Sequence, residues 1–147
     1  MPSHLAVLRA LPSYTILPGQ FVCIDTYASG STPSDFLIRP CTATTDVPVA
    51  VSNLAYDVAP GLIAALGVTG YTPVAAVPGE ELALFTWGDV APVVLGGTVS
   101  AGSLIGFNSS GLAVAVAQGS GSWFGGIACQ YGLTGGVIDI IVALGKA

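Results

Sequence analysis

The chain has 147 residues, a length typical of one domain, and 52% of them are hydrophobic while only 7% are charged. A net charge of −5 argues against binding to a nucleic-acid backbone, which needs clustered positive charge. A membrane-spanning helix is also excluded, because the best apolar stretch, residues 58–79, is interrupted by prolines and glycines. So few charges predict that sister subunits or a larger assembly cover much of the surface, and a neutral surface of Ser, Thr, Gly and Ala is the alternative.

The first 12 residues predict an N-terminal arm that becomes ordered only on an assembly, because prolines bound the short apolar stretch at residues 5–8. An ordinary first strand is the alternative for this segment. Residues 13–147 predict a single β-rich domain, with an insertion at residues 57–78. The one helix expected, residues 60–66, lies inside that insertion, with a proline near its start and Gly67 at its end.

Short apolar runs separated by Gly, Ser, Thr, Pro or Asn predict many short strands. The predicted strands are residues 14–17, 21–25, 36–40, 47–52, 81–87, 90–95, 103–108, 112–116, 124–130 and 137–144. Asn108 to Gly111 predicts a hairpin turn, and Trp87 to Val90 predicts a second chain reversal. Residues 113–116 and 137–142 are apolar at both odd and even positions, which predicts strands buried on both faces, as in a covered barrel or sandwich.

The two halves of the chain resemble each other weakly. Residues 19–25 are similar to residues 102–108, residues 48–56 to 123–131, and residues 79–85 to 136–142. Each half therefore has a strand led by glycine, a middle strand and a second strand led by glycine. Chance similarity in a chain rich in glycine and valine remains the alternative.

The segment at residues 90–105 resembles the head decoration, or capsid cement, proteins of tailed phages. The resemblance continues through the Asn108-Ser109-Ser110-Gly111 turn, the strand around Gly126-Ile127-Ala128 and the closing strand at residues 136–144. It covers residues 79–144 well and residues 19–51 loosely. It implies a small β-barrel or β-tulip, a homotrimer, and attachment to the outside of an icosahedral capsid. It implies no catalytic residues, and the arm and the insertion depart from the pattern.

Few residues suggest chemistry. The one histidine, His4, lies near the N-terminus, where order is not expected and a catalytic site would be unusual, so neither a catalytic site nor an enzyme is expected. Glu80 and Glu81 are adjacent and would point to opposite faces of a strand. A cation site could be formed by four acidic residues, Asp25, Asp35, Asp46 and Asp57. We favour the alternative interpretation, in which these residues are scattered and solvated.

Three further features have ordinary interpretations. The three cysteines, Cys23, Cys41 and Cys129, have neither zinc nor disulfide spacing and are interpreted as small buried hydrophobic residues in a reducing cytoplasm. Residues 119–125 look like a phosphate loop but lack the following lysine, so a flexible hairpin loop is expected. Trp87 and Trp123 could form a carbohydrate platform, but core or interface packing is the interpretation we favour.

Together these features predict a structural virion protein, made in the host cytoplasm, that binds the outer surface of a phage capsid and stabilises it. Its expected partners are the major capsid protein and copies of itself, with no nucleic acid, membrane, metal or cofactor. The alternative is a β-sandwich module of the virion that binds carbohydrate or a receptor.

Overall fold

The computed structural model describes residues 6–10, 16–24, 37–52 and 81–147, and the described residues form strands, turns and loops without a helix. The prediction of an all-β fold is therefore confirmed. The expected helix at residues 60–66 and the insertion around it lie outside the described residues. The division into an arm and one domain stays a prediction, although Ala6–Ala10 forms a strand, as the alternative for that segment requires.

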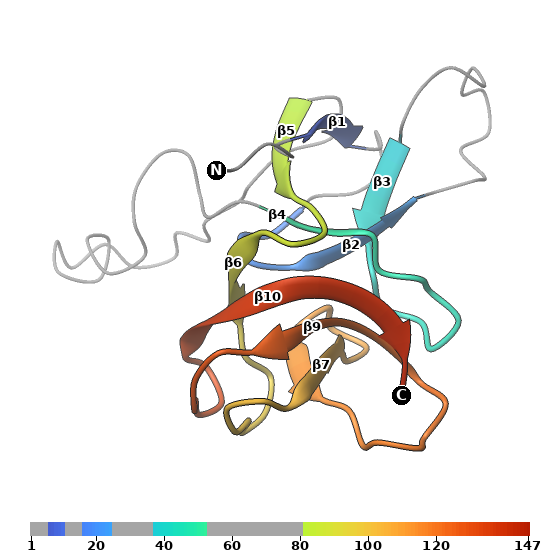
Figure 1. Ribbon diagram of the computed structural model, residues 1–147. Helices are drawn as coiled ribbons and strands as arrows, with labels where there is room; N and C mark the ends of the chain where they lie inside the picture. Colours follow the sequence, from blue (N-terminus) through green and yellow to red (C-terminus); the bar gives the residue numbers. More distant parts are fainter. Residues whose placement is uncertain (1–5, 11–15, 25–36, 53–80) are drawn as a thin grey trace, which may run out of the picture.

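The ten strands divide into two groups that follow each other along the chain (Figure 1). The first five form a closed barrel in the order β1-β3-β2-β4-β5, and the last five form a sheet in the order β6-β10-β9-β7-β8. Their bounds are β1 Ala6–Ala10, β2 Phe21–Ile24, β3 Leu37–Pro40, β4 Ala50–Ser52, β5 Glu81–Phe85, β6 Val90–Val94, β7 Leu104–Phe107, β8 Ala113–Ala115, β9 Trp123–Ala128 and β10 Val137–Lys146.

The two groups have the same topology. When β1 to β5 are matched in chain order with β6 to β10, the antiparallel strand pairs of the first group match the antiparallel strand pairs of the second. The repeat suggested by the sequence is thus present in the strand order. The halves differ in their closure, because β1 pairs with β3 as a parallel strand, whereas the second half has only an isolated parallel bridge from Leu95 to Ala113.

The register of the pairing is repeated as well. The pairs Phe21–Val51 and Val22–Ala50 between β2 and β4 correspond to the pairs Leu104–Ile127 and Ile105–Gly126 between β7 and β9. On the same correspondence, the parallel pair Ala10–Ile38 becomes the bridge Leu95–Ala113. A one-residue slip would send each side chain to the other face of its sheet, so agreement in every pair means that the halves also agree in which side chains face inward.

The two hydrophobic cores divide between the lumen of the barrel and the space between the halves. The smaller core lies in the barrel and consists of Ile16, Val22, Ile38, Ala50 and Leu84. The larger core joins the inward side chains of the second half to four residues of the first: Phe21, Cys23, Cys41 and Val51. Along β2 and β4, successive side chains therefore enter different cores, and these two strands lie at the junction of the halves (Figure 1).

Burial on both faces, expected for residues 113–116 and 137–142, is found elsewhere. It occurs in β2 and β4, which the second half covers. In β10 the expectation is wrong, because Ile138, Ile140 and Val142 are buried while Val137 and Ile141 are exposed. In β8, Ala113 is buried and Ala115 is exposed. The second sheet therefore has one face on the core and one apolar face uncovered.

Residues that favour turns shape two of the connections between strands. Asn108 accepts hydrogen bonds at Oδ1 from the backbone N–H groups of Ser110 and Leu112, and Gly111 has a φ of 78°, so the predicted hairpin between β7 and β8 is confirmed. The predicted reversal at Trp87 is a turn closed by a hydrogen bond from the Asp89 N–H to the Thr86 carbonyl. That turn joins β5 of the barrel to β6 of the other sheet, so it changes sheets and is no hairpin.

Candidate interaction surface

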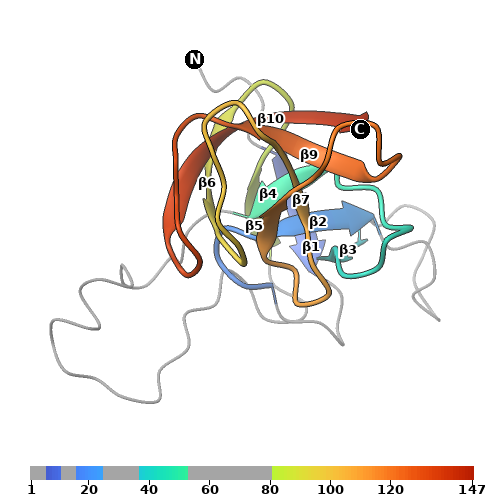
Figure 2. The ribbon, with the colours of Figure 1, turned by 90° about the horizontal axis from the view of Figure 1, so that it is seen from below.

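The outer face of the second sheet carries a row of aliphatic side chains from four adjacent strands. Register places them opposite one another, and we call them the aliphatic row: Val90, Ile141, Ile127 and Leu104. Val90 is 57% exposed and Ile141 44% exposed, while Ile127 and Leu104 are half-buried. Figure 2 views the molecule from the side of this half, with β10 and β9 running next to each other. A contiguous apolar surface of this kind is typical of a protein interface.

Both ends of this sheet extend the apolar surface through loops. Trp87 is 63% exposed in the turn before β6, which hydrogen bonds to β10 through the Gly88 N–H and the Val142 carbonyl. At the other end Tyr131 and Leu133 are exposed in the loop before β10. Trp87 therefore does not fill a core, and whether it fills an interface stays a prediction.

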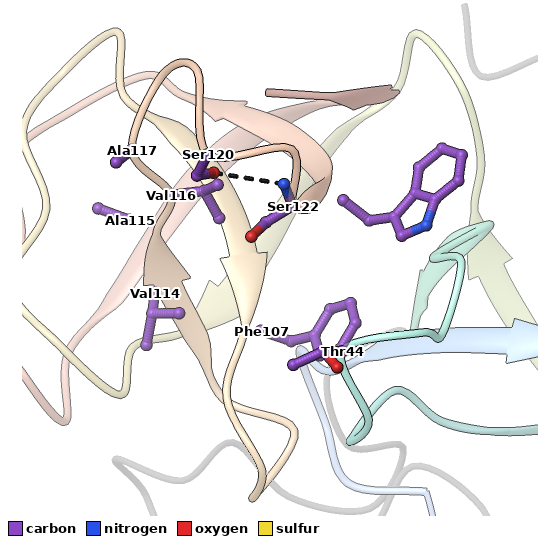
Figure 3. Close-up of a pocket in the computed structure, with 9 residues that line it drawn as sticks. Thr44, Phe107, Val114, Ala115, Val116, Ala117, Ser120 and Ser122 are labelled. Carbon is purple, nitrogen blue, oxygen red and sulfur yellow. Dashed lines mark hydrogen bonds between the residues drawn. The ribbon is translucent and has the colours of Figure 1, made fainter.

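A groove of about 260 Å³ lies beside edge strand β8 (Figure 3). Val114, Val116 and two alanines line one side, and Phe107 lies next to Thr44 of the β3–β4 loop. Ser120, Ser122 and Trp123 complete the lining, so the groove combines hydroxyl groups with two aromatic rings, and none of the described residues that line it is ionisable. It shares no residue with the aliphatic row. This combination suits a neutral ligand that has both apolar and polar faces.

The loop that borders the groove is held by hydrogen bonds. Ser120 Oγ accepts a hydrogen bond of 3.3 Å from the Ser122 N–H, and Gly121 and Ser122 each bond to the backbone of Ala147. The Lys146 ammonium lies 5.0 Å from the centroid of the Trp123 ring, which holds the indole by a cation–π contact. The expected flexible hairpin at residues 119–125 is therefore corrected, since this segment connects β8 to β9, which are separated by β7.

The β3–β4 loop is built around Asp46. Its carboxylate accepts hydrogen bonds from both terminal nitrogens of Arg39, at 2.8 and 2.5 Å, and from the N–H groups of Thr42 and Ala43. The Arg39 hydrogen bond, followed by the backbone bonds, holds the pKa of Asp46 well below its usual range even though burial opposes this. Asp46 is buried and paired, so the interpretation as a solvated acid is wrong for this residue.

The cysteines divide into two environments. Cys23 and Cys41 are buried and not disulfide-bonded, as predicted, whereas Cys129 is exposed, which corrects the prediction for that residue. A hydrogen bond with Cys23, reinforced by burial, raises the pKa of Cys41 far above its usual value. Because the thiolate is the reactive form, Cys41 is held in its inert thiol form.

Most other candidate residues lie outside the described part of the chain: His4, Asp25, Asp35, Asp57 and Glu80. Among the described residues, no three His, Cys, Asp or Glu side chains come together as a metal site would require. None of the described residues forms a helix that could cross a lipid bilayer. The surfaces above, rather than a reactive cluster, are thus the features to which a function can be attached. The sequence analysis did not predict the aliphatic row. The signal that could have predicted it is the alternation of inward and outward residues along each strand, which places Val90, Ile141 and Ile127 on the outer face.

The fold can be compared with known proteins. No protein-family model matches the chain, and no curated protein matches it. Among solved structures, the chain is similar to the N base of the head fiber protein gp8.5 of bacteriophage phi29, with a TM-score of 0.57 and 12% sequence identity. The similarity covers 95% of this chain and 92% of the phage chain. At this identity the match establishes a shared fold.

Proposed function

We propose that this chain is a non-catalytic structural protein of a phage virion, held on the outer surface of the capsid as a cement or decoration protein. The observation that carries the proposal is the similarity of fold with a phage head fiber base, which extends over nearly the whole of both chains. The resemblance of residues 79–144 to capsid decoration proteins supports it independently from the sequence.

The surface supports the same role. A solitary soluble domain usually carries about 25% charged residues, and this chain carries 7%. Large side chains are exposed on the second sheet and in the loops next to both ends of β10, among them Val90 of β6, Trp87 and Leu133. Burial of such side chains against neighbours is the main favourable term in protein association. The partners proposed are the major capsid protein and further copies of this chain, assembled as a homotrimer.

Stabilisation of the capsid follows from mass action. A protein that binds the assembled shell and not its free subunits stabilises the shell at each site by about 2.7 kcal/mol when its concentration is a hundredfold above Kd. A trimer that contacts several capsid subunits at once gains further affinity through effective concentration. Separation of the capsid subunits then also requires release of the cement protein.

The test compares particles that carry the protein with particles that lack it. We expect stoichiometric amounts of the chain in purified particles by mass spectrometry, and a higher temperature of genome release when it is present. Equal release temperatures at full occupancy would remove the stabilising role. Absence of the chain from purified particles would remove the virion assignment altogether.

The groove beside β8 favours a second candidate, the carbohydrate-binding module. Trp123 and Phe107 offer apolar rings, and Thr44 and Ser122 offer hydroxyl groups for which the described residues supply no hydrogen-bond partner. A neutral sugar presents C–H groups on one face and hydroxyls at its rim, which matches this lining. Binding on a glycan array that is lost in Trp123→Ala, but not in Trp87→Ala, would support this candidate.

A further inference from the structure

The repeated register allows each outward residue of one half to be matched with a residue of the other. The pairing of Phe21 with Val51 and of Val51 with Phe85 in the first half corresponds to Leu104 with Ile127 and Ile127 with Ile141 in the second. Three members of the aliphatic row therefore have equivalents on β2, β4 and β5. Both rows are apolar along their length.

The two rows differ in what covers them. Phe21 is 1% exposed and Val51 is fully buried, because both belong to the core shared with the second half, and Phe85 packs against that core. The surface that receives Phe21 is closely fitted, since a Cβ added to Gly125 would lie 2.5 Å from its ring. The equivalent row of the second half has no such cover within the described residues, and Ile141 is exposed there.

We propose that the aliphatic row is a subunit interface and that its occupant is a second copy of this chain. The first half shows that a row in this position is an interface, and what covers it there is the other half of the same repeat, which every copy of this chain carries. The inference supplies a contact surface for the oligomer proposed above and therefore rests on that proposed function, but its test needs no capsid.

The charge distribution fits a second copy. Among the residues of β6, β7, β9 and the first half of β10, Asp139 is the one ionisable side chain. A nearly neutral face can approach the surface of another copy without opposing clusters of like charge, whose juxtaposition would disfavour the contact. A heterologous contact of this kind closes into a ring when its rotation permits, which is the geometry of a homotrimer.

The experiment measures association of the full chain by analytical ultracentrifugation over a range of concentrations. The test variant is Val90→Lys combined with Ile141→Lys, and the matched control is Ile24→Lys, because Ile24 is 45% exposed on β2 and lies outside the row. We expect the double variant to associate roughly 100-fold or more weakly than the wild type, because an interface cannot bury unpaired ammonium groups. The control should associate like the wild type.

A milder variant guards against misfolding of the double variant. Ile141→Ser should weaken association by a smaller factor while circular dichroism and the thermal midpoint of the dissociated protein stay unchanged. A wild type that remains monomeric at high micromolar concentration overturns the inference, as does a double variant that associates normally. A double variant that keeps its oligomer but loses particle binding also overturns it, because the row would then contact the capsid, and the cement function would survive.

Discussion

The two halves share a topology and a register, yet one is a closed barrel and the other is a five-stranded sheet that shares its core with four residues of the barrel half. Some interior positions differ in size between the halves. Ile38 and Ala50 of the barrel correspond to Ala113 and Gly126 in the second half, which are smaller. Phe21 of the first half also belongs to the core of the second, where its ring lies against Gly125. The same hydrogen-bond plan is thus combined with differently filled interiors in the two halves, because protein interiors must be filled.

The first prediction tests the closure of the barrel, and it has the largest expected effect on stability. Deletion of residues 2–12 would remove β1, which pairs with both β3 and β5. We expect the thermal midpoint to fall by about 10 °C or more, since a loss of several kcal/mol shifts a domain of this size by that amount. Differential scanning calorimetry measures the change. An unchanged midpoint together with weaker particle binding is the result that an N-terminal arm requires.

The unequal burial of matched residues gives the second prediction. Phe21→Ala should destabilise the protein by about 3–5 kcal/mol, because it leaves a cavity between the halves. Leu104→Ala, at the equivalent position on β7, should cost about 1 kcal/mol or less in the dissociated protein, because that side chain lies on the uncovered face. Urea unfolding of both variants provides the comparison. Equal losses would mean that the rows are equally buried in solution.

The fit between the halves gives the third prediction. Gly125→Ala places a methyl group 2.5 Å from one atom of the Phe21 ring and 3.2 Å from Pro48. We expect a loss of about 1–3 kcal/mol from overpacking. Phe21→Leu should partly relieve it, so the double variant Phe21→Leu, Gly125→Ala should be more stable than the sum of the single losses predicts. Additive losses in a double-mutant cycle would show that the two residues do not touch.

The loops that follow β3 and β8 give the smallest predicted effect. Asp46 anchors the first by an ion pair, whereas backbone bonds to Ala147 hold the second. Asp46→Asn should lower the free energy of unfolding by about 1 kcal/mol at neutral pH. Because the pKa of Asp46 is depressed in the folded protein, this contribution is complete above the unfolded pKa of about 3.9 and is lost as the pH falls toward the lower folded value.

Urea unfolding at pH 6 and at pH 2.5 checks this pH dependence. The difference between the wild type and Asp46→Asn should narrow at the lower pH. Ser120→Ala, in the loop after β8, serves as the control and should show no such narrowing, because the Ser120 hydroxyl bonds to the backbone N–H of Ser122 and not to an ionisable side chain. A constant difference between wild type and Asp46→Asn would mean that the ion pair does not stabilise the fold.

The sequence by itself determined the positions of nearly all the strands. Runs such as residues 90–95 and 137–144 coincide with β6 and β10 to within two residues, and the Asn108–Gly111 turn lies where its residue types predict. The repeat was also visible, because glycines lead matching strands in both halves. These features depend on local backbone chemistry and on apolar spacing, which are written in neighbouring residues.

Only the tertiary structure decided which faces are covered. Phe21 and Ile141 both alternate outward from their own half, yet one is buried and the other exposed, because the second half packs on the first and the described residues leave the second half uncovered. The local sequence also left open whether residues 6–10 would pair with other strands, and the pairing of Ala6–Ala10 with β5 is a tertiary feature. Burial depends on partners far away in the chain, and apolar spacing within a strand contains no information about which surface will arrive to cover it.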